Sequence, residues 1–164
     1  SGHSQGGLFA LSTGGRVMCD GIIAIAPGGN VGAPIYKEKV GESVNDARKL
    51  IEQGKGNEKT TLSDFESSKG KYAITTTPSV YLSWFDPDGA MNQEKVSRKI
   101  NPNIPILFIV PTNDYPGLLK VKQVMFDALP KHPKTKLYEP STNHLGAPSA
   151  SVDEIMQWTI SVAN

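Results

Sequence analysis

Three short apolar runs along the chain predict the strands of a sheet. Residues 22–26 and 106–110 are continuous apolar runs rich in β-branched side chains, and glycine or proline residues bound them. Runs of this kind are typical of strands that are buried on both faces of a parallel sheet. Residues 136–139 form a weaker third run, which fits a strand at the sheet edge.

Apolar residues at helical spacing predict the helices that connect these strands. Residues 5–15 form the first helix, which a pair of glycines ends, and residues 118–129 form the second, which a proline ends. Ser151 and Glu154 have the spacing of a capping box and predict a C-terminal helix. This order of elements predicts an α/β fold in which crossover helices join parallel strands.

Residues 31–104 have a different character and predict an insertion between the first two strands. Charged residues of both signs alternate over residues 37–71, a pattern typical of a solvated surface. Residues 43–53 predict a helix with Ser43 as its N-cap, and residues 72–85 are apolar and aromatic. We therefore expect a mostly helical cap that lies on the functional edge of the sheet.

The composition is that of one soluble globular domain. The 164 residues are 38% hydrophobic and carry a formal net charge of +1. This balance gives no excess of one sign to attract nucleic acid or anionic lipid, and no run approaches the roughly 18 apolar residues that a membrane span needs. A single cysteine excludes an internal disulfide framework and leaves the compartment, cytoplasm or periplasm, undetermined.

Residues 2–6, Gly-His-Ser-Gln-Gly, fit the pattern G-x-S-x-G. This pattern places a serine on a sharp turn between a strand and a helix, with glycines on both sides because a Cβ atom there would collide with the neighbouring backbone. A glycine-rich helix N-terminus is the alternative interpretation. The helix and the buried strand that are expected next favour the turn.

A serine hydroxyl needs a base to become a nucleophile, and the base needs a carboxylate to orient it. We expect His3 to point away from the serine, and His132 precedes the third strand at the wrong end of the sheet. His144 follows the third strand, and Asp114 follows the strand before it, so both lie at the carboxyl edge where α/β sheets place catalytic groups. The alternatives are a surface-loop histidine and a turn-forming aspartate. Two turn residues of the insertion are second choices for the acid: Asp86 and Asp88.

The chain order Ser4, Asp114, His144 is that of α/β-hydrolases. The chain resembles the carboxyl-terminal half of that superfamily, and the matches span nearly all of it. Residues 2–7 resemble the nucleophile elbow, residues 22–27 the sixth strand, residues 106–114 the seventh strand with the acid loop, and residues 143–146 the histidine loop. The insertion stands where the family usually carries a cap. The implied fold class is a partial α/β-hydrolase fold.

The resemblance implies a serine hydrolase that acts on small-molecule carboxylic esters. Ser4 would attack the acyl carbonyl, His144 would transfer the proton, and Asp114 would orient His144. The backbone N–H of Gln5 would be one donor of the oxyanion hole. We expect no metal, because the three histidines are scattered, and no nucleotide cofactor, because no phosphate-binding glycine motif occurs.

Other functions stay open on the sequence alone. The same triad would serve a serine peptidase or a thioesterase, and a noncatalytic binding or interaction module is the alternative from a different class. The aromatic cluster of the insertion either lines an acyl pocket or forms the core of the cap. Its members are Tyr81, Leu82, Trp84 and Phe85.

The resemblance also implies that this chain is a fragment. Residues 1–30 and 105–164 would be the last part of the family's core, and the missing upstream half of the protein would be their partner and would supply the second oxyanion donor. The strand at residues 22–26 would have lost the neighbour that carries Ser4, and an unpaired apolar edge favours association.

We therefore expect that the 164-residue chain alone neither folds stably nor hydrolyses an ester. Thermal unfolding and hydrolysis of a p-nitrophenyl ester test this expectation. A cooperative transition together with steady turnover by this chain would contradict it.

Overall fold

The computed structural model describes residues 1–66 and 69–164, which form two compact units. Unit 1 comprises Ser1–Gly29 and Gln93–Asn164, and unit 2 comprises Asn30–Asn92. The second boundary differs from the expected end of the insertion at residue 104. The reason is that helix α4 (Gln93–Ser97) packs against helix α1 of unit 1 and buries Val96.

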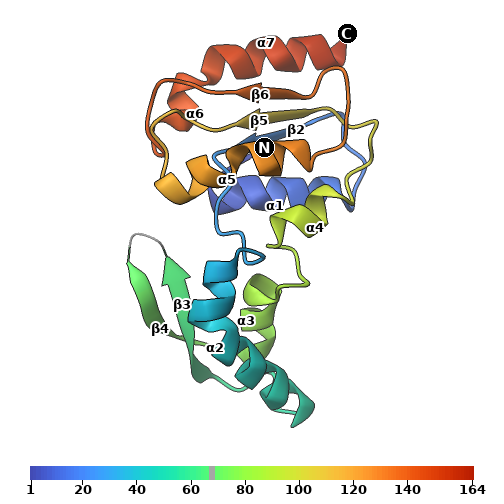
Figure 1. The fold of residues 1–164 in the computed structure, drawn as a ribbon. Coiled ribbons are helices and arrows are strands. Elements are labelled where there is room, and N and C mark those ends of the chain that lie inside the picture. Colours follow the sequence, from blue (N-terminus) through green and yellow to red (C-terminus); the bar gives the residue numbers. More distant parts are fainter. Residues whose placement is uncertain (67–68) are drawn as a thin grey trace. The chain divides into compact units, whose positions relative to one another are not determined.

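Unit 1 is built on a four-stranded parallel sheet with the order β1-β2-β5-β6 (Figure 1). The predicted strands are confirmed, and each ends one residue earlier than expected. Every residue of β5 is buried, as expected for a central strand. The strands are β1 (Gly2–His3), β2 (Ile22–Ile25), β5 (Ile106–Ile109) and β6 (Lys136–Tyr138).

Helices cover both faces of this sheet and explain its apolar strands. Trp158 of α7 packs in one cluster with Leu107 and Ile109, which point to one face. Phe126 of α5 contacts the ring of Phe108 on the opposite face, with ring centroids 6.1 Å apart. The helices of unit 1, besides α4, are α1 (Gln5–Gly14), α5 (Pro116–Asp127), α6 (Ala147–Ala150) and α7 (Val152–Ala163).

The two-residue strand β1 corrects the expectation that β2 has lost its neighbour. Gly2 lies opposite Ala24 and His3 lies opposite Ile25 in parallel register. The backbone N–H of Ser4 then donates to the carbonyl of Ile25 at 2.9 Å. The carboxyl end of β2 is therefore paired on this side, next to the turn that holds Ser4.

The predicted capping box at the start of α7 does not form. Ser151 makes no side-chain cap, and its hydroxyl donates instead to the carbonyl of Ala147 at 2.7 Å. Glu154 pairs with Lys136 at 2.8 Å. The reason is that α6 directly precedes α7, so the serine completes the preceding helical turn.

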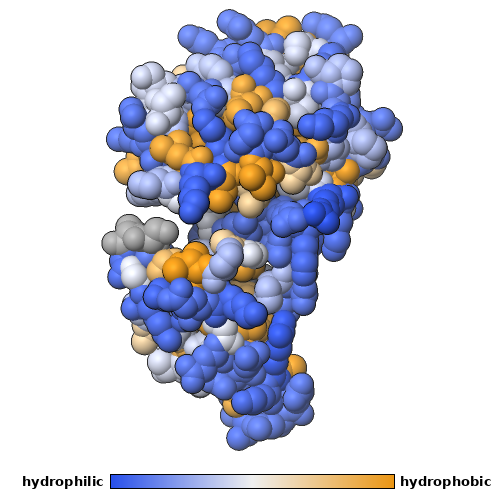
Figure 2. Space-filling view, in the orientation of Figure 1, coloured by the Kyte–Doolittle hydropathy of each residue, from blue (hydrophilic) through white to orange (hydrophobic). Residues whose placement is uncertain are grey.

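Unit 2 combines helices with a β-hairpin that the sequence did not predict. Its elements are α2 (Pro34–Glu52), β3 (Thr60–Glu66), β4 (Gly70–Thr76) and α3 (Pro78–Phe85), and β3 pairs with β4 in antiparallel register. The surface over α2 is mainly hydrophilic, as expected for the charged stretch (Figure 2).

The start predicted for the helix of unit 2 was wrong. Helix α2 begins at Pro34, so Ser43 lies inside it and is not the N-cap. The Ser43 hydroxyl accepts a hydrogen bond from the backbone N–H of Ser63 at 3.0 Å. Because a serine can bond a neighbouring strand from inside a helix, its presence alone does not mark a helix start.

Trp158 tests how strongly α7 is attached to the sheet. Its side chain is buried, and Nε1 donates to the carbonyl of Lys134 at 2.7 Å. We expect Trp158→Ala to lower the free energy of unfolding of the full-length protein by about 3–5 kcal/mol, measured by urea denaturation. Met156→Ala, on the exposed side of the same helix, is the control and should change it by less than about 0.5 kcal/mol. Equal effects of the two substitutions would contradict this packing.

Candidate active site

A parallel bridge beyond the ends of β5 and β6 places Asp114 beside His144. Asn113 and Asn143 form a parallel bridge, and the N–H of Asn113 donates to the carbonyl of Thr142 at 3.0 Å. Asp114 and His144 are the next residues of the two loops. Their side chains meet in a hydrogen bond of 2.7 Å between Oδ1 of Asp114 and Nδ1 of His144.

This pair defines the orientation of the imidazole. The Asp114 side chain is 0% exposed and that of His144 is 9% exposed. Because an ionised carboxylate only accepts hydrogen bonds, Nδ1 of His144 is the donor, and Nε2 of the neutral ring is left as an acceptor. Oδ1 of Asp114 also accepts from the backbone N–H of Tyr115 at 2.7 Å.

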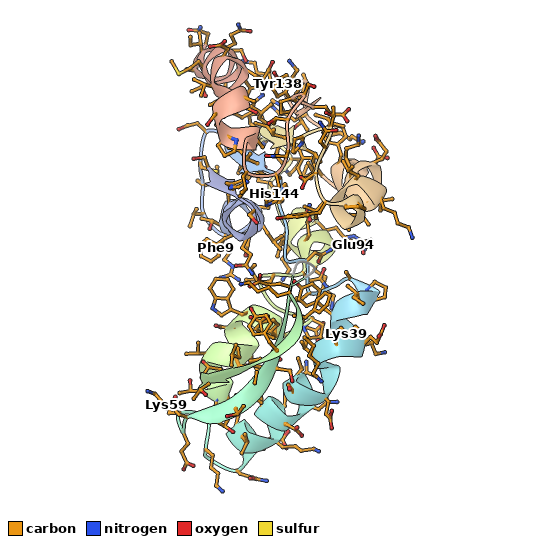
Figure 3. The ribbon with its side chains drawn as sticks, turned by 90° about the vertical axis from the view of Figure 1, so that its left-hand side faces the viewer. Phe9, Lys39, Lys59, Glu94, Tyr138 and His144 are labelled. Atoms are coloured by element: carbon orange, nitrogen blue, oxygen red, sulfur yellow. The ribbon has the colours of Figure 1, made fainter. Side chains whose placement is uncertain are left out.

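Two aromatic rings contact the ring of His144. The centroids of Tyr115 and of His3 each lie 4.8 Å from that of His144. Because a carbonyl can only accept, Nε2 of His3 donates to the carbonyl of His144, at 2.9 Å. We expected only that His3 points away from the serine, and the sequence carries no signal for this contact. His3 therefore joins the turn of Ser4 to the loop of His144, whose place after Tyr138 can be followed in Figure 3.

Ser4 occupies a strained turn between β1 and α1. Its φ angle is 57°, in a region that favours glycine and costs other residues about 1–3 kcal/mol. Neighbouring backbone groups hold this conformation, because the Ser4 carbonyl accepts from the N–H of Gly28 at 3.1 Å. The strand, turn and helix follow one another as the G-x-S-x-G pattern predicts.

Only one of the two glycines in that pattern meets a steric limit. A Cβ atom on Gly2 would lie 2.0 Å from the carbonyl oxygen of Gly6, whereas a Cβ atom on Gly6 would meet nothing within 4 Å. The tight position on the helical side is Gly7, where a Cβ atom would lie 3.0 Å from the carbonyl oxygen of Ile25. The prediction that a side chain at Gly6 would collide was therefore wrong.

The structure brings the predicted residues together to different degrees. Asp114 and His144 form a direct hydrogen bond. Ser4 is connected to His144 only through its neighbour His3, which donates to the His144 carbonyl. In the part of the chain that the structure describes, no hydrogen bond joins the Ser4 hydroxyl to His144. Gln5 opens α1, so its N–H has no acceptor within the helix. His132 lies in the loop before β6, where its Nδ1 accepts from the N–H of Lys134 at 3.1 Å.

The aromatic residues predicted for an acyl pocket lie in unit 2 and differ in exposure. Tyr81 is 1% exposed, stacks on Phe85 with centroids 4.6 Å apart, and donates from its hydroxyl to the carbonyl of Ser63 at 2.6 Å. Burial raises the pKa of Tyr81 to about 12. Trp84 is 45% exposed. Tyr81 is thus part of the core of unit 2, and Trp84 lies on its surface.

Neither a metal centre nor a membrane-crossing helix is found within residues 1–66 and 69–164. No group of three or more histidine, cysteine, aspartate or glutamate side chains there could hold a metal ion. None of the helices combines the length and the apolar character that crossing a membrane requires.

The fold is similar to those of two solved proteins. No family model and no curated protein matches the sequence. DcsB, solved in complex with its substrate analogue, is similar with a TM-score of 0.61 and 16% identity over 96% of this chain and 62% of that chain. A highly thermostable carboxyl esterase from Bacillus coagulans, solved with glycerol, is similar with a TM-score of 0.57 and 18% identity over 99% of this chain and 63% of that chain.

The chain has an α/β-hydrolase-like fold. The chain spans less than two thirds of the length of both solved proteins. In an α/β-hydrolase-like fold, parallel strands carry functional groups at their carboxyl ends, which is where Ser4, Asp114 and His144 lie in this chain.

The glycines of the serine turn give a matched pair of substitutions. We expect Gly2→Ala to destabilise the full-length protein by about 1–3 kcal/mol in urea denaturation, because its Cβ atom would overlap backbone atoms. A Cβ atom on Gly6 would meet open space, so Gly6→Ala should leave the free energy of unfolding unchanged or raise it slightly. A Gly2→Ala variant as stable as Gly6→Ala would refute the close approach of the turn to α1.

Proposed function

We propose that the protein is a serine hydrolase of carboxylic esters in which Ser4, His144 and Asp114 form a catalytic triad. The observation that carries this proposal is the buried hydrogen bond of 2.7 Å between Asp114 and His144 beside the strained serine turn. A buried histidine with one nitrogen bonded to a carboxylate is oriented to use the other as a base. The similarity to a carboxyl esterase favours an ester as the substrate.

The chemistry takes place in two half-reactions. Nε2 of His144 accepts the proton of the Ser4 hydroxyl as Oγ forms a bond to the ester carbonyl carbon. The tetrahedral intermediate then expels the alcohol, which takes this proton from His144, and leaves an acyl group on Ser4. Water attacks the acyl group in the same way and regenerates the serine. Asp114 keeps Nδ1 protonated and stabilises the imidazolium in both steps.

The backbone N–H of Gln5 supplies one hydrogen bond to the developing oxyanion. It belongs to the first turn of α1, where N–H groups lack helical acceptors and the helix dipole favours negative charge. Removal of one such donor typically slows turnover about 10²- to 10³-fold, so this N–H would contribute strongly to stabilising the transition state.

Unit 2, Asn30–Asn92, is proposed as the cap. Among the aromatic residues predicted for the acyl pocket, Trp84 has a large exposed surface that can contact an acyl chain. Tyr81 and Phe85 stack on each other and support the helix that carries Trp84. Their contribution to binding is therefore to hold Trp84 in place.

Covalent labelling by a fluorophosphonate tests the proposed triad in the full-length protein. We expect Ser4→Ala and His144→Ala to abolish labelling, and Asp114→Asn to slow it about 10⁴-fold, because the amide stabilises the wrong tautomer of the histidine. His132→Ala, at the other end of the sheet, is the control and should label at the parent rate. Labelling should be measured as a rate constant by intact-protein mass spectrometry.

The other outcomes separate the alternative functions. A folded protein that does not label would be a noncatalytic binding module, and the proposal would be wrong. Labelling at Ser4 together with turnover of peptide or thioester substrates, but not of oxygen esters, would keep the triad and replace the proposed substrate class.

A further inference from the structure

The second carboxylate oxygen of Asp114 lacks a partner among the described residues. Both hydrogen bonds to this side chain, from His144 and from the N–H of Tyr115, go to Oδ1. Oδ2 is fully buried and accepts no hydrogen bond from any described residue. Leaving a buried carboxylate oxygen without a donor is costly, and native proteins satisfy such atoms with protein groups or ordered water.

A small cavity adjoins this carboxylate. Its volume is about 10 Å³, and Asp114 contributes to its wall. This volume is at the lower limit for a single water molecule, about one probe sphere. Most of the wall is apolar, including Phe108 and Leu118, so any polar partner must come from few groups.

Two side chains of the cavity wall carry N–H donors, Gln93 and Lys122. The ammonium of Lys122 pairs with Glu139 in a partly exposed ion pair. The Gln93 side chain belongs to α4 and is buried, with 2% exposure. The amide of Gln93 is thus the buried donor group that shares the cavity with Asp114.

We propose that one buried water occupies this cavity, accepts a hydrogen bond from the amide of Gln93 and donates one to Oδ2 of Asp114. Gln93 is then a positioning residue that acts through the water and Asp114. The two bonds prevent the carboxylate from rotating and keep Oδ1 directed at Nδ1 of His144. The catalytic meaning of this arrangement rests on the proposed function, but the water site itself does not.

The chemistry of the amide suits this role better than a charged group would. A lysine at this position would form an ion pair with Asp114 and reduce the negative charge that stabilises the imidazolium. A glutamate would repel the carboxylate across a cavity with little water to screen the charges. An uncharged amide fixes the carboxylate and leaves its charge for His144.

A crystal structure of the protein with ordered solvent tests the water site without any assay of activity. We expect one water in this cavity, about 2.6–3.2 Å from both Oδ2 of Asp114 and the Gln93 amide. A dry cavity, a direct bond from the amide to Oδ2, or a water bonded to groups other than Gln93 would overturn the proposed site.

Two substitutions in α4 test the positioning role. Gln93→Met keeps the side-chain volume and removes the amide, and the control Ser97→Ala changes another buried polar residue of the same helix that does not line the cavity. The readout is the low-field proton resonance of the His144 Nδ1–H in NMR. We expect Gln93→Met to shift or broaden this resonance, and Ser97→Ala to leave it as in the parent.

The rate of Ser4 labelling by a fluorophosphonate is the second readout. Loss of one hydrogen bond in a network to a charged group should slow labelling about tenfold in Gln93→Met and leave Ser97→Ala unchanged. A Gln93→Met resonance and rate equal to those of the parent would overturn the role of Gln93. If Gln93→Met does not fold, the presence or absence of the crystallographic water alone tests the proposal. A parent protein that does not label would instead contradict the proposed hydrolase.

Discussion

The parallel register of β5 and β6 is the constraint on which the proposed site depends. Ile109 lies opposite Tyr138 at the end of the ladder, and Asn113 then bridges to Asn143, so the loop after β6 contains one residue more than the loop after β5. The residues that follow this bridge are Asp114 and His144. Without the extra residue after β6, the carboxylate and the imidazole would be separated by about 3.3 Å along the strand direction. The pairing of β5 with β6, together with the extra residue in the loop after β6, therefore determines a polar contact outside the sheet.

The other two strands of the sheet end in strained residues at the same edge. Among the described non-glycine residues, only Ser4 after β1 and Ala26 after β2 have positive φ angles. The N–H of Ala26 donates to the carbonyl of Ile109 at 2.6 Å, so a sheet hydrogen bond holds it as β2 ends. Each strand thus terminates in a residue that the sheet holds in place, and functional groups placed there need little further support.

The sequence predicted the features that arise from local pattern. Continuous apolar runs identified β2 and β5 to within one residue, because only a strand covered on both faces is apolar throughout. The hairpin of unit 2 was missed because β3 buries only Leu62 and Phe65 among polar residues, so its pattern resembles a charged surface. The boundary at residue 92 was missed because α4 is short and attaches to unit 1 through long-range packing.

The candidate site shows the same division between local and long-range signals. Asp114 and His144 could be predicted because each follows a recognisable strand and their chemical types suit one reaction. His3 contacts His144 by donating to a backbone carbonyl, which any residue can offer, and Gln93 reaches Asp114 only across a cavity. A polar residue in a polar segment carries no sequence signal for burial, because the cavity that receives it is formed by distant strands and helices. Residues that support a site therefore become visible only when the fold is known.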